Sequence, residues 1–253
     1  MKVKSFKLKA MAVLLLIMFI SGVAIAGDKM FVNGFDADYP PFSFIDKSGK
    51  PAGLDVDSLN WIAKKMGFKV KHQPTDWSAI VPSLQTGKID LIASGMSITA
   101  ERQKVVAFTN PYWTVRQILV THKNSNLTVE KCLQTGSKIG TQRGNAETKW
   151  IEANLLKKGK KFELLQYDSA PLAIDDMVMG RIDAVATSDT ILKEAVERGL
   201  PIKEIGSYGQ PDNNYGYAVR KDDNDFLNKL NKGLDQLHAS PYWKELKKKY
   251  DFN

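Results

Sequence analysis

Arg102 is the side chain best suited to do chemistry in this sequence, and the chemistry it suits is carboxylate binding. A guanidinium presents a planar fork of N–H donors that can meet both oxygens of a carboxylate. Arg102 follows the polar loop Ser97-Ile98-Thr99, near the start of a short helix predicted over residues 101–104. Backbone N–H groups at such a helix start add to the attraction for an anion. The alternative is a surface arginine on that helix.

A second turn in the sequence offers anion-binding N–H groups. Gly144-Asn145-Ala146 leads into a helix predicted over residues 146–155, so its N–H groups can point at the same anion. Glu147 follows directly and adds a carboxylate beside that turn. The sequence therefore offers a cation in one region and an anion-binding turn with an acid in another.

Nucleophilic catalysis and metal binding have little support in the sequence. Cys132 is the only cysteine, so an intramolecular disulfide is impossible, and no histidine lies close to it in the sequence. The three histidines, His72, His122 and His238, are scattered. We therefore predict no metal site and no cofactor, and the role of Cys132 stays open.

Strands alternate with helices in two series, over residues 30–108 and over residues 138–205. In the first series, apolar residues at helical spacing end at Gly67, a suitable helix stop. In the second, Ser169 can cap a helix over residues 171–179. This alternation predicts an α/β architecture with largely parallel sheets.

Two β-prone runs, residues 114–123 and 215–219, fall between and after the two series, and we interpret both as crossings between lobes. The first run is too long for another short core strand. The predicted division is residues 27–115 plus 216–253 for lobe 1 and residues 116–215 for lobe 2. Ligands in open α/β sheets bind beyond the carboxyl ends of the strands, so two facing lobes predict a ligand cleft with two hinge strands.

The N-terminus is typical of a secretory signal peptide over residues 1–26. A lysine-rich start precedes an apolar stretch that closes with Ala24-Ile25-Ala26. The alternative is a membrane anchor, but the apolar run over residues 11–20 is short for a span of about 20 residues. No cysteine follows that run, which disfavours a lipid anchor. We therefore expect a periplasmic protein.

The basic balance of the chain lies partly in this leader. The formal net charge is +8, and removal of the leader's four lysines, with no acids, leaves +4. A mildly cationic mature chain carries no nucleic-acid footprint, so nucleic acid is not an expected partner.

Seven segments, in this order and spacing, resemble the periplasmic polar-amino-acid-binding proteins, the solute-binding family that includes glutamine, histidine and lysine/arginine/ornithine binders. The resemblance runs from about Met30 to the C-terminus. It implies a two-lobed periplasmic-binding-protein fold of type II. The segments are Asp36-Ala-Asp-Tyr-Pro-Pro-Phe42, Gly53-Leu-Asp-Val-Asp57, Ile80-Val-Pro-Ser-Leu84, Gly87-Lys-Ile-Asp90, Ser97-Ile-Thr-Ala-Glu-Arg102, Phe108-Thr-Asn-Pro-Tyr112 and Gly180-Arg-Ile-Asp-Ala184.

The resemblance implies roles for residues of the first lobe. Arg102 matches the arginine that holds the ligand carboxylate. Ser94 and Gly95 match the segment whose backbone carbonyl meets the ligand ammonium, and Ser97 supplies an N–H or hydroxyl. A free amino acid carries both charges, and each needs a partner when it is buried.

The resemblance also implies roles for the second lobe. It places carboxylate contacts at Asn145 and Ala146, although the family often has a threonine there, which puts side-chain contacts in doubt. We expect Asp189 to bind the ammonium. Strict spacing to the family's aspartate falls on Ser188, one residue earlier, and Asp189 could instead cap a helix.

Aromatic and acidic residues are the candidates that contact the ligand side chain. Tyr39 and Trp77 match family positions that pack on the ligand, with core burial as the alternative. Asp36 matches a position that touches side-chain nitrogens in some members, and Glu147 is also acidic. Two acids favour a basic or amide side chain. Trp113, at the hinge entry, could belong to the pocket or to the core.

The expected function is therefore capture of a free polar amino acid for an ABC importer, with no catalytic residue. Ligand would favour a closed state, since neither lobe alone satisfies both of its charges. Expected partners are the amino acid and the importer's permease and ATPase, and we expect a monomer. The alternatives are a periplasmic cyclohexadienyl (prephenate or arogenate) dehydratase, with Glu147 as the proton donor, and the sensor lobe of a receptor kinase.

Overall fold

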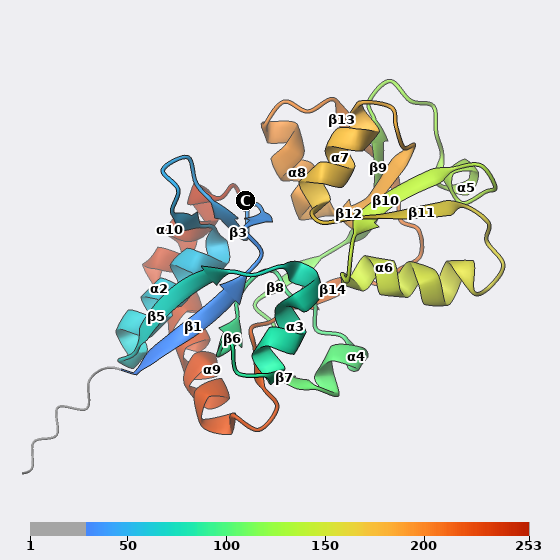
Figure 1. Cartoon of the computed structure of the whole chain (residues 1–253). Helices are drawn as coiled ribbons and strands as arrows, with labels where there is room; N and C mark the ends of the chain where they lie inside the picture. Colours follow the sequence, from blue (N-terminus) through green and yellow to red (C-terminus); the bar gives the residue numbers. More distant parts are fainter. Residues whose placement is uncertain (1–28, 253) are drawn as a thin grey trace, which may run out of the picture.

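The structure, a computed structural model, describes residues 29–252 as two α/β lobes joined by a pair of strands (Figure 1). The predicted signal peptide, residues 1–26, lies outside the described residues. Within residues 29–252, no helix is both long and apolar enough to cross a membrane.

A five-stranded sheet, in the order β5-β1-β6-β15-β7, forms the centre of the first lobe. β1 pairs in parallel with β5 and β6, whereas β15 runs antiparallel to both β6 and β7. The sheet is thus completed only after the chain has returned from the second lobe. Its strands are β1 (Met30–Phe35), β5 (Lys69–Pro74), β6 (Leu91–Ile92), β7 (Val106–Phe108) and β15 (Ala218–Arg220).

The second lobe repeats this plan with the order β11-β10-β12-β9-β13. β10 pairs in parallel with β11 and β12, and β9 runs antiparallel to β12 and β13. In each sheet the reversed strand is therefore the one that the chain enters from the other lobe. The strands are β9 (Gln117–His122), β10 (Lys138–Gln142), β11 (Glu163–Tyr167), β12 (Ala184–Ser188) and β13 (Ile202–Gly206).

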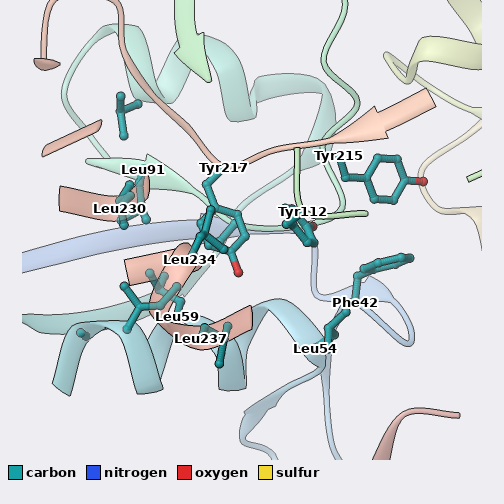
Figure 2. Close-up of a cluster of buried hydrophobic side chains, with 14 of the residues drawn as sticks. Phe42, Leu54, Leu59, Leu91, Tyr112, Tyr215, Tyr217, Leu230, Leu234 and Leu237 are labelled. Atoms are coloured by element: carbon teal, nitrogen blue, oxygen red, sulfur yellow. The ribbon is translucent and has the colours of Figure 1, made fainter. Parts of the chain in front are cut away.

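Apolar faces of two helices form the main core of the first lobe. Leu59 of one helix meets Leu230 and Leu234 of the other within one buried cluster (Figure 2). Gly233 permits this approach, because a Cβ there would lie 2.4 Å from the side chain of Ile62. The lobe's helices are α2 (Leu54–Met66), α3 (Trp77–Gln85), α4 (Ala100–Gln103), α9 (Asn224–His238) and α10 (Pro241–Lys249).

The sheet of the second lobe has a buried apolar cluster on each face. Along β9, Ile118 and Val120 join one cluster while Leu119 joins the other, as the alternation of a strand requires. Cys132 belongs to the second cluster, and burial raises the pKa of its thiol to about 12. The thiol is therefore protonated at neutral pH. The lobe's helices are α5 (Val129–Cys132), α6 (Ala146–Ile151) with the π-helical turn η1 (Glu152–Leu156), α7 (Ala170–Val178) and α8 (Asp189–Glu197).

Two antiparallel strands, β8 (Trp113–Val115) and β14 (Asn213–Tyr215), make the hinge between the lobes (Figure 1). Trp113 contacts the rings of Phe252 and Trp243 and packs on the core of the first lobe. The structure thus resolves its open assignment, because Trp113 belongs to the core.

A small antiparallel sheet holds the loop that follows β1. Its strands are β2 (Asp38–Tyr39), β3 (Ser43–Ile45) and β4 (Pro51–Ala52). The Ser43 hydroxyl donates to the carbonyl oxygen of Asp36 at 2.8 Å. This contact fixes the loop at the end of β1.

The structure confirms two α/β lobes with two hinge strands and corrects the crossings. Residues 114–123 are not one connection, because residues 117–122 form β9, a buried strand inside the second sheet. Residues 215–219 likewise divide between β14 and β15. The sheets are largely parallel, as predicted, with one reversed strand in each, β15 and β9. The predicted boundaries at 115/116 and 215/216 stay a prediction.

Candidate functional site

A cavity lies between the lobes, beyond the carboxyl ends of β1, β6 and β10. Its position agrees with the rule for open α/β sheets. Its walls come from both lobes and from the hinge strand β14. The lining residues are Asp36, Tyr39, Trp77, Gly95, Ser97, Arg102, Gln142, Asn145, Ala146, Glu147 and Tyr215.

Arg102 reaches the cavity from α4 in the first lobe. The Thr99 hydroxyl caps this helix by accepting from the Arg102 N–H at 3.2 Å. The guanidinium donates to the carbonyl oxygens of Ser97 at 3.0 Å and Gly144 at 3.2 Å, and lies 5.4 Å from the centre of the Trp77 ring. Among the described residues, no carboxylate oxygen lies within ion-pair distance of it. The guanidinium thus faces the cavity without a direct ion pair in the described part of the chain.

Glu147 reaches the cavity from α6 in the second lobe. Its side chain is buried, with 5% of the residue exposed. Burial raises the pKa of the Glu147 carboxyl, while the Arg102 charge and the amide of Gln117 oppose that rise. The site therefore carries the Glu147 carboxyl group on one wall and the Arg102 guanidinium on the other.

Asp36 and Gln142 join the two lobes across the cavity. The Gln142 amide, at the end of β10, donates to Asp36 Oδ2 at 2.6 Å. The N–H of Asp38 donates to the other carboxylate oxygen, Oδ1, at 2.9 Å. Burial raises the pKa of the Asp36 carboxyl, and the Gln142 hydrogen bond opposes the rise.

Tyr39, Tyr215 and Gly95 pack together at one wall of the cavity. The hydroxyls of Tyr39 and Tyr215 are hydrogen-bonded at 2.8 Å. Gly95 has a left-handed φ of +56°, and a Cβ there would lie 2.6 Å from the Tyr39 ring. Its N–H donates to the buried carboxylate of Asp55 at 2.6 Å. Only glycine fits this position without displacing Tyr39.

Most residues expected at the site line this one cavity, but two do not. The side chain of Ser94 is buried below the cavity, where its hydroxyl accepts from the Asp36 N–H at 2.9 Å and bonds the Ser43 hydroxyl at 2.8 Å. Ser94 therefore supports the loop that carries Asp36 and does not line the cavity.

Asp189 is the second exception. Its carboxylate pairs with the Arg116 guanidinium at 3.2 Å, outside the cavity lining, and accepts from the Arg116 N–H. The cap of α8 is Ser188, whose hydroxyl accepts from the Ile191 N–H. The structure thus places Asp189 outside the cavity lining, where the Arg116 guanidinium pairs with its carboxylate, and its contact with a ligand ammonium stays a prediction.

Further contacts between the lobes flank the cavity. The Ser169 hydroxyl, at the start of α7, donates to Asp38 Oδ2 at 2.6 Å. The Lys193 ammonium of α8 donates to the carbonyl oxygen of Asp251. Together with the bonds of Arg102 and Gln142, these contacts show the lobes closed on one another.

Two lining residues, Gln142 and Tyr215, were missed by the sequence analysis. Gln142 ends a parallel strand, so the strand-end rule alone could have selected it. Tyr215 reaches the site through the bridge that β14 makes with Ser97. No local sequence pattern predicts that pairing.

Comparisons with known proteins agree with this fold. Residues 31–253 match the family model for bacterial extracellular solute-binding proteins, family 3. The L-arginine-binding protein of Pseudomonas aeruginosa is 32% identical and covers 89% of each chain.

Two solved structures are also similar. A substrate-binding protein of an ABC uptake transporter from Streptococcus pneumoniae, with bound histidine, has a TM-score of 0.82 at 29% identity, covering 88% of this chain and 93% of that one. An ancestral amino-acid-binding protein, a precursor of cyclohexadienyl dehydratase, has a TM-score of 0.79 at 32% identity, covering 87% and 95%. These similarities confirm the two-lobed type II fold.

Proposed function

Because the chain belongs to the bacterial extracellular solute-binding proteins of family 3, we propose that it captures one free α-amino acid in the cleft between its lobes. The observation that carries the proposal is the cavity itself, where the Arg102 guanidinium has no carboxylate oxygen within 4.0 Å among residues 29–252. A half-buried guanidinium that is bonded only to carbonyl oxygens can still receive a ligand carboxylate in a two-pronged contact.

The proposed ligand has a basic side chain, with an amide as the second choice. The ionisable acids and bases of the cavity lining are Asp36, Glu147 and Arg102, which sum to a formal charge of −1 when all are ionised. An amino acid with a cationic side chain carries +1 and leaves the closed site neutral. The aromatic rings of Tyr39 and Trp77 suit the aliphatic stem of such a ligand. The similarity to an L-arginine-binding protein supports this class.

The proposed mechanism is closure about the hinge strands β8 and β14. Arg102 lies on the first lobe and Gln142 and Glu147 on the second, so a ligand held by both lobes stabilises only the closed state. We place the protein in the periplasm, where the closed form would deliver its ligand to the permease and ATPase of an importer. The family membership supports these assignments.

A thermal-shift screen against the common amino acids tests the proposal. Ligand at 100 times its dissociation constant adds about 2.7 kcal/mol to the free energy of unfolding, which raises Tm by several degrees. We expect arginine, lysine or histidine to give the largest shift. No shift with any amino acid would overturn the proposal.

The dehydratase alternative rests on one specific observation, the buried acid Glu147, whose raised pKa suits proton donation. We propose that the protein is a binder rather than an enzyme, because it belongs to a family of solute-binding proteins and resembles an L-arginine-binding protein over most of its length. Turnover of prephenate or arogenate by the purified protein would reverse this choice.

A further inference from the structure

Two charges of opposite sign face the cavity from opposite lobes, the half-buried guanidinium of Arg102 and the buried carboxylate of Glu147. The guanidinium N–H groups of Arg102 bond only to carbonyl oxygens, and Glu147 has no lysine or arginine nitrogen within 4.0 Å in the part of the chain that the structure describes. They are therefore not a pair with each other at ion-pair distance. A zwitterion placed between them would supply each with its missing partner.

The other acids near the cavity already have partners. Both carboxylate oxygens of Asp36 accept hydrogen bonds, from Gln142 and from the Asp38 N–H. Asp189 is paired with Arg116 on the surface of the second lobe. Glu147 is thus the one lining carboxylate of the described chain that lacks both a side-chain donor of normal hydrogen-bond geometry and a cation.

A second, independent observation lies beside Glu147. Gln117 is 1% exposed, and neither polar atom of its amide has a hydrogen-bond partner among residues 29–252. The amide is close enough to lower the pKa of Glu147, although it makes no hydrogen bond of normal geometry there. Gln117 pairs in register with Ser188, the residue at the position where the resemblance implies an aspartate. The Gln117 amide thus leaves an acceptor, Oε1, and a donor, Nε2, unpartnered beside the Glu147 carboxylate in the described part of the chain.

We propose that Glu147 binds the α-ammonium of the ligand from the second lobe, while Arg102 holds its carboxylate from the first. This inference rests on the proposed function and adds to it the partner of the ammonium. An ammonium offers three N–H donors, and one of them would donate a charge-assisted hydrogen bond to the Glu147 carboxylate. Ser188 has no carboxylate with which to pair the ammonium, and in this proposal Glu147 supplies the carboxylate instead. The site then selects 2-amino acids over the matching 2-hydroxy acids.

Calorimetry with ligand pairs tests this assignment. The probes are L-arginine and L-histidine, each compared with its 2-hydroxy-acid analogue, and the variants are Glu147→Gln and the matched control Asp189→Asn. Truncation of one partner of a buried charge pair weakens binding strongly, so we expect Glu147→Gln to lose about 100-fold for the amino acid. The hydroxy acid has no ammonium to lose, so its affinity changes by less than about 3-fold between wild type and Glu147→Gln. Asp189→Asn keeps wild-type affinity for both.

Three outcomes overturn the assignment. They are an unchanged amino-acid affinity in Glu147→Gln, an equal loss for amino and hydroxy acids, and a loss confined to Asp189→Asn. Failure of the wild-type protein to bind any amino acid is a separate result that refutes the proposed function itself. Should Glu147→Gln not fold, a structure of the wild-type complex decides, because the inference requires the ammonium within about 3.2 Å of a Glu147 carboxylate oxygen.

Discussion

Nη2 of Arg102 in the first lobe donates a hydrogen bond to the carbonyl oxygen of Gly144 in the second, at 3.2 Å. The same guanidinium faces the cavity and stacks near Trp77. A carbonyl dipole satisfies the geometry of one N–H but does not neutralise a full charge. This contact therefore closes the lobes around the cavity while leaving the guanidinium able to bind an anion.

Gly95→Ala will weaken ligand binding because its Cβ displaces Tyr39. The φ of Gly95 is +56°, and the new Cβ would lie 2.6 Å from the Tyr39 ring. Gly87→Ala is the matched control, since its φ is +75° with no atom within 4 Å of the added Cβ. Both variants lose about 1 kcal/mol of stability from the left-handed backbone. Titration calorimetry should show a loss of affinity of about 10-fold or more in Gly95→Ala alone. Equal affinities in the two variants would contradict the packing described here.

Asp36→Asn will shift the ligand preference from basic toward neutral side chains. The substitution removes one negative charge from the cavity and keeps the shape of the side chain. We expect the ratio of arginine affinity to glutamine affinity to fall about 10-fold or more. Asp38→Asn is the control, because the Asp38 carboxylate contacts Ser169 beside the cavity but does not line it. A ratio that falls equally in both variants would show that Asp36 does not contact the ligand side chain.

Asp55 will make the stability of the protein depend on pH. Burial raises the pKa of its carboxyl from 3.8 to about 7, against the hydrogen bonds from Tyr112 and Gly95. The folded state then holds the proton more tightly than the unfolded state between these values. Stability from this group is therefore greatest below pH 3.8 and is lost as pH rises toward 7.

Denaturant unfolding from pH 4 to pH 8, with Asp55→Asn as the reference, measures this dependence. The free energy of unfolding of the wild type should fall relative to the variant by up to about 1.4 kcal/mol per pH unit, and the difference should level off above pH 7. A difference that stays constant with pH would show that Asp55 has an ordinary pKa.

The strand and helix alternation predicted the two lobes because each series has its own local periodicity. The alternation could not show which strand of each sheet runs antiparallel to its neighbours. β9 and β15 are the first strands of each sheet after the chain enters from the other lobe. Their antiparallel direction is set by long-range pairing, of β9 with β12 and of β15 with β6. Local sequence contains no signal for such a partner.

The site was predictable where it follows the ends of strands and the motifs of the first lobe. Asp36, Arg102 and Glu147 line the cavity as expected. Asp189 shows the limit, since its carboxylate pairs with Arg116 outside the cavity lining. The sequence showed the acidic side chain of Asp189. It did not show that Arg116, which lies far from it in the sequence beside a hinge strand, would pair with that side chain.

Carboxylate capture by Arg102 is the claim on which the account depends, and calorimetry of Arg102→Ala tests it most directly. L-Arginine is titrated into the wild type, into Arg102→Ala, and into Arg116→Ala, whose guanidinium pairs with exposed acids outside the cavity. We expect binding by the wild type and by Arg116→Ala, and a loss of affinity of at least about 100-fold in Arg102→Ala. Full affinity in Arg102→Ala, with the variant folded, would contradict this claim.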